Sequence, residues 1–149
     1  MTIKQLKVYS PASIANLGPG FDVFGVALDG LGDKVSVKRV SEPGVRVIMK
    51  GYEADQIPVK ARLNSAGAVM EAALSRLSEP EGVVMEIEKG IPPGKGMGSS
   101  GASAAGAAVA AVKRAEKGID METAILHSFK DTREKEREET VGVKKERGF

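Results

Sequence analysis

Residues 91–103 read Ile91-Pro92-Pro93-Gly94-Lys95-Gly96-Met97-Gly98-Ser99-Ser100-Gly101-Ala102-Ser103, and an alanine-rich run over residues 104–112 follows directly. Glycine has no Cβ, so a loop this rich in glycine takes positive φ readily and brings backbone N–H groups close to a ligand. The helix expected over the alanine-rich run turns unpaired N–H groups and the positive end of its dipole toward the loop. The hydroxyl groups of Ser99, Ser100 and Ser103 lie at that same end. The stretch therefore predicts a phosphate-binding loop at a helix N-terminus.

Two better-known glycine loops fit these residues less well. The P-loop pattern G-x-x-x-x-G-K-[ST] is absent, because Lys95 is followed by Gly96 and not by a hydroxyl residue. The dinucleotide pattern G-x-G-x-x-G is matched by Gly96, Gly98 and Gly101. That fingerprint also needs a strand that ends in an acidic residue about 20 positions further on. No run of β-branched residues that would form such a strand follows the loop here. A Gly/Ser/Ala linker before an ordinary helix is the remaining alternative.

The composition is that of one domain with no strong electrostatic or redox specialisation. The chain has 149 residues, a net charge of +2, no cysteine and a single histidine. These numbers exclude a disulfide framework, thiolate chemistry and most multi-histidine metal sites, and they indicate neither nucleic acid nor a membrane as a partner. The first residues lack the apolar segment of a signal peptide, so we expect a cytoplasmic protein.

The apolar periodicity predicts strands on both sides of one helix. Alternation of apolar and polar residues predicts strands over residues 3–9, 35–40, 45–49 and 83–89. We expect Pro11 to end the first strand, and the Pro43-Gly44 turn to join the second and third strands as a hairpin. Apolar residues at helical spacing predict a helix over residues 64–77. With the helix after the glycine loop, this order predicts an α+β layer with helices on one face.

Three polar residues each have two interpretations. Asn16 and Asp22 flank the Gly18-Pro19-Gly20 turn inside a stretch, residues 12–28, that we expect to be a loop. They either cap the turn, as Asn and Asp often do, or point together into one cleft. Asn64 stands where a helix N-cap would stand, which is the favoured interpretation, although it could instead face a ligand.

Two motifs together resemble the GHMP small-molecule kinases, and the homoserine kinases among them. The first is Pro11-Ala-Ser-Ile-Ala-Asn-Leu-Gly-Pro-Gly-Phe-Asp-Val-Phe-Gly-Val-Ala-Leu28, which is similar almost residue for residue to the N-terminal signature of homoserine kinases. The second is residues 92–103, similar to the family ATP loop P-x-x-x-G-L-G-S-S-A-x-S, with Met97 for the usual Leu and Gly101 for a usual Ala. The resemblance covers roughly residues 1–113.

The resemblance implies ATP-dependent phosphorylation of the L-homoserine hydroxyl to O-phospho-L-homoserine, a step toward threonine. By this carry-over, residues 92–102 bind the ATP triphosphate, with Ser99 or Ser100 near Mg²⁺. Asn16 and Asp22 contact homoserine, Asp22 through the ammonium group, and Asn64 lies near the adenine base. The fold implied is the family's two-layer half, which resembles ribosomal protein S5 domain 2. No general base is visible, and no catalytic residue is assigned.

The resemblance ends near Lys113, so we expect residues 1–113 to form the GHMP kinase N-terminal domain and residues 114–149 a divergent, charged tail. The last twenty residues hold seven basic and six acidic side chains, a composition that rarely builds a packed core. A shifted reading frame or a truncated product would explain so abrupt a change. His127 does not match the family's histidine element, so it is assigned no role.

Three functions therefore remain open from the sequence. The leading one is a homoserine kinase or its N-terminal portion. A GHMP kinase for another small alcohol, such as shikimate, is a neighbouring alternative. The third is a non-catalytic ATP-binding fragment, since a lone first half would lack the opposing wall of the active site. Such a half would also expose apolar surface and favour self-association, for example as a homodimer.

Overall fold

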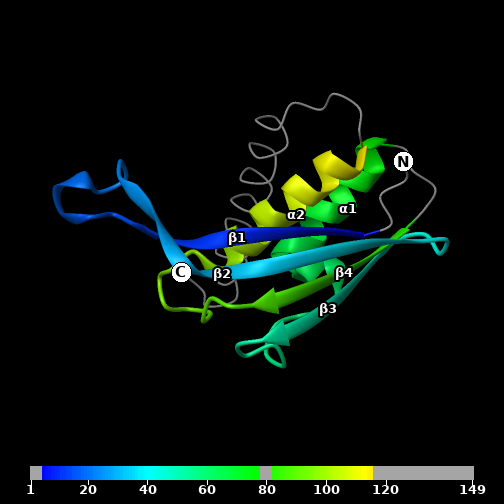
Figure 1. Ribbon diagram of the computed structural model, residues 1–149, viewed down its shortest axis with the longest axis horizontal. Coiled ribbons are helices and arrows are strands. Elements are labelled where there is room, and N and C mark those ends of the chain that lie inside the picture. Colours follow the sequence, from blue (N-terminus) through cyan, green and yellow to red (C-terminus); the bar gives the residue numbers. More distant parts are fainter. Residues whose placement is uncertain (1–4, 78–81, 116–149) are drawn as a thin grey trace, which may run out of the picture.

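The computed structural model describes residues 5–77 and 82–115, which form one sheet covered on one face by two helices (Figure 1). The strands are β1 (Gln5–Ala15), β2 (Gly25–Val40), β3 (Val45–Gly51) and β4 (Gly82–Lys89). The α-helices are α1 (Ser65–Leu77) and α2 (Ser99–Ala115), and η1 (Gly18–Gly20) and η2 (Ala61–Leu63) are short 3-10 turns. The α+β class and the helices on one face are confirmed.

The sheet order is β1-β2-β4-β3, with β1 and β4 antiparallel to β2, and β3 parallel to β4. The predicted hairpin between the second and third strands is therefore wrong, because β4 lies between them. The start of β4 enters the turn that links them, where Val83 N donates to the Gly44 carbonyl at 2.8 Å. A Cβ on Gly82 would lie 2.0 Å from the Glu42 carbonyl oxygen, so only glycine fits at this crossing.

The first strand also differs from the prediction, since Pro11 does not end it. β1 continues to Ala15, with a register shift between Pro11 and Ser13, and it pairs with a β2 that begins at Gly25. Proline is tolerated here because β1 is an edge strand and a bulge relieves the ladder. The stretch expected to be a loop is thus a long β-hairpin whose tip projects beyond one end of the sheet (Figure 1).

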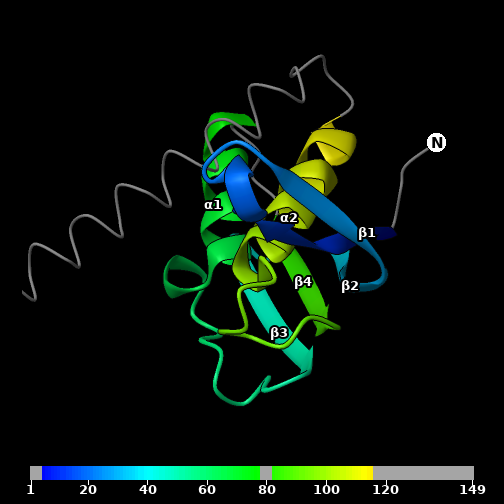
Figure 2. The same cartoon turned by 90° about the vertical axis from the view of Figure 1, so that its left-hand side faces the viewer.

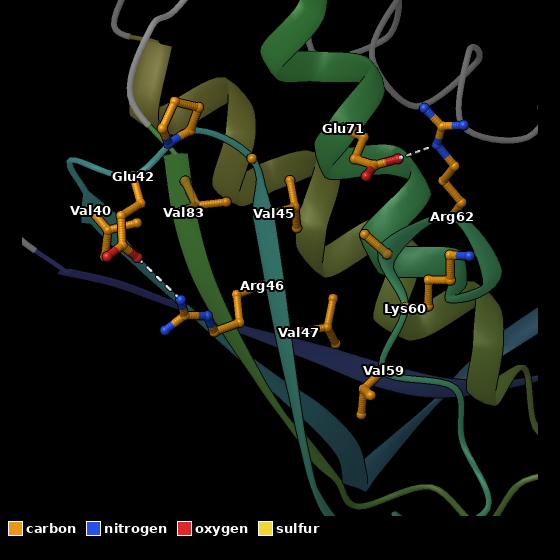
Figure 3. Close-up of a pocket in the computed structure, with 13 residues that line it drawn as sticks. Val40, Glu42, Val45, Arg46, Val47, Val59, Lys60, Arg62, Glu71 and Val83 are labelled. Atoms are coloured by element: carbon orange, nitrogen blue, oxygen red, sulfur yellow. Dashed lines mark hydrogen bonds and ion pairs between the residues drawn. The ribbon is translucent and has the colours of Figure 1, made fainter.

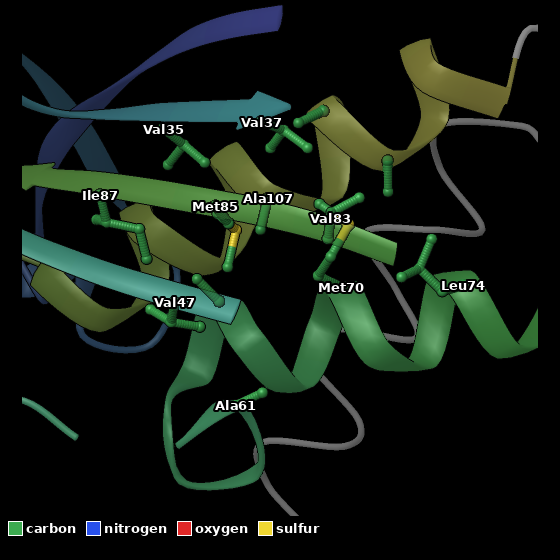
Figure 4. Close-up of a cluster of buried hydrophobic side chains, with 13 residues drawn as sticks. Val35, Val37, Val47, Ala61, Met70, Leu74, Val83, Met85, Ile87 and Ala107 are labelled. Carbon is green, nitrogen blue, oxygen red and sulfur yellow. The ribbon is translucent and has the colours of Figure 1, made fainter. Parts of the chain in front are cut away.

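The core lies between the sheet and the helices (Figure 4). Strand residues at alternate positions face the helices, and alanines of α2 pack onto them. The buried core residues of the strands and helices include Val35, Val37, Val47, Met70, Val83, Met85, Ile87, Ala107 and Ala110. Helix α2 approaches β2 closely, because a Cβ on Gly106 would lie 2.8 Å from Val35 Cγ2. The few aromatic residues and the alanine-rich sequence thus give a thin, aliphatic interface. It fixes the start of α2 against the sheet.

Candidate phosphate-binding and substrate site

The glycine loop connects β4 to α2 as the sequence predicts, and the helix begins at Ser99. Gly94, Gly96 and Gly98 all take left-handed φ, at 69°, 70° and 68°. A Cβ on Gly94 or Gly96 would meet nothing within 4 Å, so the loop backbone lies against open space. The first N–H groups of α2 have no acceptor within the helix. The loop and the helix start therefore offer backbone donors to an anion, and the geometry fits a phosphate group.

The other predicted loop residues surround this backbone. Pro92 and Pro93 are half-buried at its entry, and Lys95 is exposed. Met97 packs against the small apolar cluster of Ala12, Ile91 and Ala102. Gly101 is exposed in the first turn of α2. The loop is thus held by its apolar edge, while its cation and its glycines face outward.

The three serines at the start of α2 have different environments. Ser99 is buried and its hydroxyl donates to the Ile91 carbonyl at 3.0 Å. Ser103 is buried too, and its hydroxyl donates to Asp33 at 2.6 Å. Ser100 is exposed, and within residues 5–77 and 82–115 no group bonds its hydroxyl. Of the two serines predicted to lie near Mg²⁺, Ser100 is the one whose hydroxyl faces the open side.

A buried polar cluster of Asp33, Lys89, Ser99 and Ser103 lies beneath the loop. Asp33 is completely buried and Lys89 is 4% exposed. The Lys89 ammonium donates to Asp33, to the Ser99 carbonyl at 3.0 Å and to Ser103 Oγ at 2.8 Å. All three ammonium hydrogens thus have acceptors, so the buried positive charge is fully paired.

The Asp33 carboxylate also holds the start of the loop, because its Oδ1 accepts from Gly90 N at 3.0 Å and from Ile91 N at 3.1 Å. Sequence reasoning missed Asp33 and Lys89. A signal was present, since Asp33 is in phase with the inward-facing Val35 and Val37, and Lys89 with Met85 and Ile87. Charged residues of opposite sign at inward positions of two neighbouring strands predict a buried pair.

The structure brings the β1–β2 hairpin next to the glycine loop. Ser13 N donates to the Met97 carbonyl at 3.1 Å, and a Cβ on Gly98 would lie 2.5 Å from Ser13 Oγ. Figure 2, viewed from the end where the hairpin projects, shows its tip and the glycine loop at the same end of the sheet. The two sequence motifs therefore belong to one surface.

At the hairpin tip, Asn16 and Asp22 both take left-handed φ, at 61° and 60°. Asn16 Oδ1 accepts from Asp22 N at 2.8 Å, so Asn16 caps the turn. No described residue donates to the Asp22 carboxylate, which is exposed. The capping interpretation is confirmed for Asn16, and Asp22 presents a negative charge to solvent. A ligand role for either residue stays a prediction.

Asn64 is the N-cap of α1, as the favoured interpretation predicts. Its Oδ1 accepts from Ala66 N and from Gly67 N, both at 3.1 Å. Its Nδ2 donates to the Pro58 carbonyl at 2.9 Å. The side chain is 4% exposed, so its amide is already engaged, and its predicted position near adenine stays a prediction. Helix α1 begins beside the glycine loop, since Ser65 Oγ donates to the Ser100 carbonyl at 3.3 Å.

A separate groove of about 570 Å³ lies along the edge of β3. Valines line it, among them Val45, Val47 and Val59, and two ion pairs lie at its rim (Figure 3). They join Arg46 to Glu42 at 3.1 Å and Arg62 to Glu71 at 3.8 Å. None of the predicted site residues lines this groove. We place the site at the glycine loop, because the anion donors and the exposed hydroxyl converge there.

Within residues 5–77 and 82–115, no group of three or more His, Cys, Asp or Glu side chains is placed to hold a metal ion. In the same part of the chain, no helix is both long and apolar enough to cross a membrane. His127 and the predicted tail from residue 116 onward lie outside the described residues.

Homoserine kinases are among the curated proteins to which this chain is similar. The chain is 42% identical to a homoserine kinase of Methanococcus vannielii over 106 residues, which are 71% of this chain and 35% of that protein. It is 40% identical to a homoserine kinase of Xanthomonas campestris pv. campestris over 109 residues, which are 73% of this chain and 34% of that protein. The chain thus spans about a third of the length of the curated relatives that it matches.

Solved structures share the fold. A homoserine kinase from Cytophaga hutchinsonii matches with a TM-score of 0.75 and 27% identity, over 86% of this chain and 42% of that one. Mevalonate kinase from Methanococcus jannaschii matches with a TM-score of 0.64 and 16% identity, over 86% of this chain and 47% of that one, which shows the fold alone.

The family described as GHMP kinases N terminal domain matches residues 63–134, so the match runs past Lys113. The predicted domain boundary at that residue stays a prediction. The family match includes the N-terminus of α1, the glycine loop and α2, and the relatives at 40% identity or more are homoserine kinases. The chain therefore contains a region that matches the GHMP kinase N-terminal domain.

Proposed function

We propose that this protein acts as an ATP-dependent homoserine kinase, which converts L-homoserine to O-phospho-L-homoserine in threonine biosynthesis. The observation that carries the proposal is the loop of three left-handed glycines that runs into the N-terminus of α2, with the exposed Ser100 hydroxyl beside it. The names of the relatives support the acceptor, and the near-complete N-terminal signature supports it further. We also propose that the protein acts in the cytoplasm on a small-molecule substrate. The homodimer stays a prediction.

The loop would bind the triphosphate through its backbone. Residues 92–102 present N–H groups from a glycine backbone and from the first turn of α2, where the helix dipole favours negative charge. Ser100 is the better candidate for a hydroxyl beside Mg²⁺, because the Ser99 hydroxyl is already donated to Ile91. When bound, Mg²⁺–ATP supplies the phosphoryl group and the metal neutralises charge that develops on it.

The hairpin tip would bind the acceptor. Asp22 carries an exposed carboxylate that can pair with the ammonium group of homoserine. Asn16 holds the backbone of Asp22 in a left-handed turn, so that it fixes where this carboxylate points. Phosphoryl transfer depends mainly on positioning and charge stabilisation; Asp22 would contribute positioning of the acceptor, and the N–H donors of the loop together with the metal would contribute charge stabilisation.

The test is ADP release by the 149-residue chain with Mg²⁺–ATP, with and without L-homoserine. We expect release that depends on homoserine, and we expect Asp22→Asn to raise the KM for homoserine at least about tenfold with little change in the KM for ATP. Asparagine keeps the size of the side chain and tolerates left-handed φ, so this variant removes the charge alone.

Other outcomes separate the alternatives. ATP that protects the chain from unfolding without any turnover would identify a nucleotide-binding fragment. Turnover with shikimate and none with homoserine would replace the proposed acceptor by another small alcohol. If the chain shows no turnover and ATP does not protect it from unfolding, the nucleotide site is refuted.

A further inference from the structure

The buried polar cluster joins both ends of the glycine loop. At the entry, Asp33 Oδ1 accepts from Gly90 N and Ile91 N. At the exit, Asp33 Oδ2 accepts from Ser103, and Lys89 donates to the Ser99 carbonyl. One side chain from β2 therefore ties the two residues that follow β4 to Ser103 of α2.

Between these ends, Met97 packs against Ala12, Ile91 and Ala102, and the loop residues other than Met97 and the two prolines are exposed. Three of the loop residues are glycines at left-handed φ, and Lys95 is exposed. Glycine loses more conformational freedom on ordering than any other residue, so such a loop keeps one conformation only when its ends are fixed. Hydrogen bonds fix the loop at three places. Two loop N–H groups donate to the Asp33 carboxylate, the Ser99 hydroxyl donates to the Ile91 carbonyl, and Ser13 N donates to the Met97 carbonyl.

A buried ion pair is a weak source of stability, because two desolvated charges gain little over well-packed apolar side chains. A role in folding alone therefore does not explain why a buried carboxylate lies at this point. Its position does: the carboxylate is aimed at the backbone N–H groups at which the loop begins. These are the groups that an aliphatic side chain of the same size would leave without an acceptor.

We propose that Asp33 is a positioning residue for nucleotide binding, which acts by holding the entry of the glycine loop through Gly90 N and Ile91 N. Lys89 neutralises the buried charge of Asp33, and the hydrogen bond from Ser103 connects the same carboxylate to α2. This inference rests on the proposed function, because it takes ATP as the ligand of the loop. It predicts that the affinity for ATP depends on whether residue 33 offers a hydrogen-bond acceptor, and not on whether residues 33 and 89 are charged.

Two double variants separate the acceptor from the charge. Asp33→Asn/Lys89→Met keeps an oxygen for Gly90 N and Ile91 N, while its amide group can donate to Ser103. Asp33→Leu/Lys89→Met has the same net charge and nearly the same volume, but it offers no acceptor. Both variants lack Lys89, so any direct contribution of the ammonium to ATP binding cancels between them.

The measurement is calorimetric titration of each full-length variant with Mg²⁺–ATP, combined with amide hydrogen exchange at Gly90 and Ile91. We expect the affinity of the Asn/Met variant for ATP to be at least about tenfold higher than that of the Leu/Met variant. A single misplaced group produces an effect of this size. We also expect fast exchange at Gly90 N–H in the Leu/Met variant only. Equal affinities, or equal protection of these two amides, would overturn the inference.

Two controls keep the result separate from folding and from the proposed function. Val47→Ala weakens the core on β3, a strand that carries none of the residues of the loop or the polar cluster, and we expect it to bind ATP as the unsubstituted chain does, although it is less stable. If either double variant fails to fold, Ser103→Ala removes one donor from Asp33 and leaves the pair intact. We expect this variant to weaken ATP binding about twofold to threefold, which corresponds to a loss of well under 1 kcal/mol, and an unchanged affinity would overturn the inference.

The two proposals fail in different ways. If the unsubstituted chain does not bind ATP, the proposed function is refuted and Asp33 has no nucleotide to serve. If the unsubstituted chain binds ATP and the two double variants bind it equally, the function stands and the role of Asp33 is refuted.

Discussion

The base of the glycine loop and the tip of the β1–β2 hairpin are built in opposite ways. At the base, a carboxylate, an ammonium group and the Ser103 hydroxyl are buried and bonded to one another. At the tip, apolar side chains face solvent: Phe21 is 67% exposed, Val23 76% and Phe24 60%. The proposed phosphate side of the site is thus assembled from interior contacts, whereas the proposed acceptor side stands on a two-stranded projection.

This difference indicates how the two halves of the site respond to substitution. A buried, fully bonded group cannot be changed without leaving its partners unpaired, so its loss affects folding and binding together. A side chain on an exposed hairpin has few partners, so its loss affects recognition with little effect on stability.

The largest effect is expected for Asp33→Asn as a single substitution. It leaves the Lys89 ammonium buried with an amide as its nearest partner, and breaking a buried pair from one side costs about 3–5 kcal/mol. The matched control is Glu88→Gln, which breaks the exposed pair of Lys34 and Glu88, 3.1 Å apart. We expect that control to change stability by less than about 1 kcal/mol. Urea unfolding measures both, and similar values for the two variants would contradict the expected difference between a buried and an exposed ion pair.

The second effect is expected at the loop glycines. Gly98→Ala places a Cβ 2.5 Å from Ser13 Oγ at a left-handed φ, so we expect a loss of about 1–3 kcal/mol and weaker ATP binding. Gly101→Ala is the matched control, because position 101 is helical and a Cβ there meets nothing within 4 Å. We expect that variant to gain up to about 1 kcal/mol. Thermal unfolding of the pair would contradict the loop geometry if both changes had the same sign.

Asn64 provides the third prediction, because its two interpretations separate by experiment. Asn64→Ala removes the N-cap of α1 and should lower stability by about 1–2 kcal/mol. Asn64→Ser restores a cap and should recover most of that loss. If the serine variant is stable yet no longer prefers ATP to GTP, the predicted position near adenine is supported. If it keeps that preference, Asn64 is a cap alone.

The parts of this fold that could be predicted from sequence are those where one local signal decides. The periodicity of residues 64–77 and the Asn64 cap gave α1, and alternation over residues 83–89 gave β4 within one residue. The glycine loop and the helix after it followed from glycine and alanine content. These signals lie within one segment, so no knowledge of its neighbours was needed.

The parts that were wrong depend on pairing between segments. Pro11 looked like a strand end because its missing N–H is visible in sequence, while the free edge that tolerates it is not. The turn at Pro43-Gly44 looked like a hairpin because the insertion of β4 is a long-range event. The buried polar cluster was missed for the same reason: Asp33 and Lys89 are 56 residues apart, and only their inward phase hinted at their contact.

The smallest effect on stability is expected at the hairpin tip. Phe21→Ser and Val23→Thr remove exposed apolar area from the projection, so we expect each to change stability by less than about 0.5 kcal/mol. Met70→Ala, in the buried core, should by contrast cost about 2–5 kcal/mol. The informative measurement for the tip is sedimentation, because a contiguous exposed apolar patch favours self-association.

If the tip mediates the predicted homodimer, Phe21→Ser/Val23→Thr should shift the chain toward monomer at a concentration at which the unsubstituted chain is dimeric. An unchanged dimer would place the contact elsewhere. The same double variant also tests the comparison between the two regions. Weaker homoserine binding with unchanged ATP affinity would show that the projection serves the acceptor, whereas a parallel loss of ATP affinity would show that the tip and the loop base are one coupled unit.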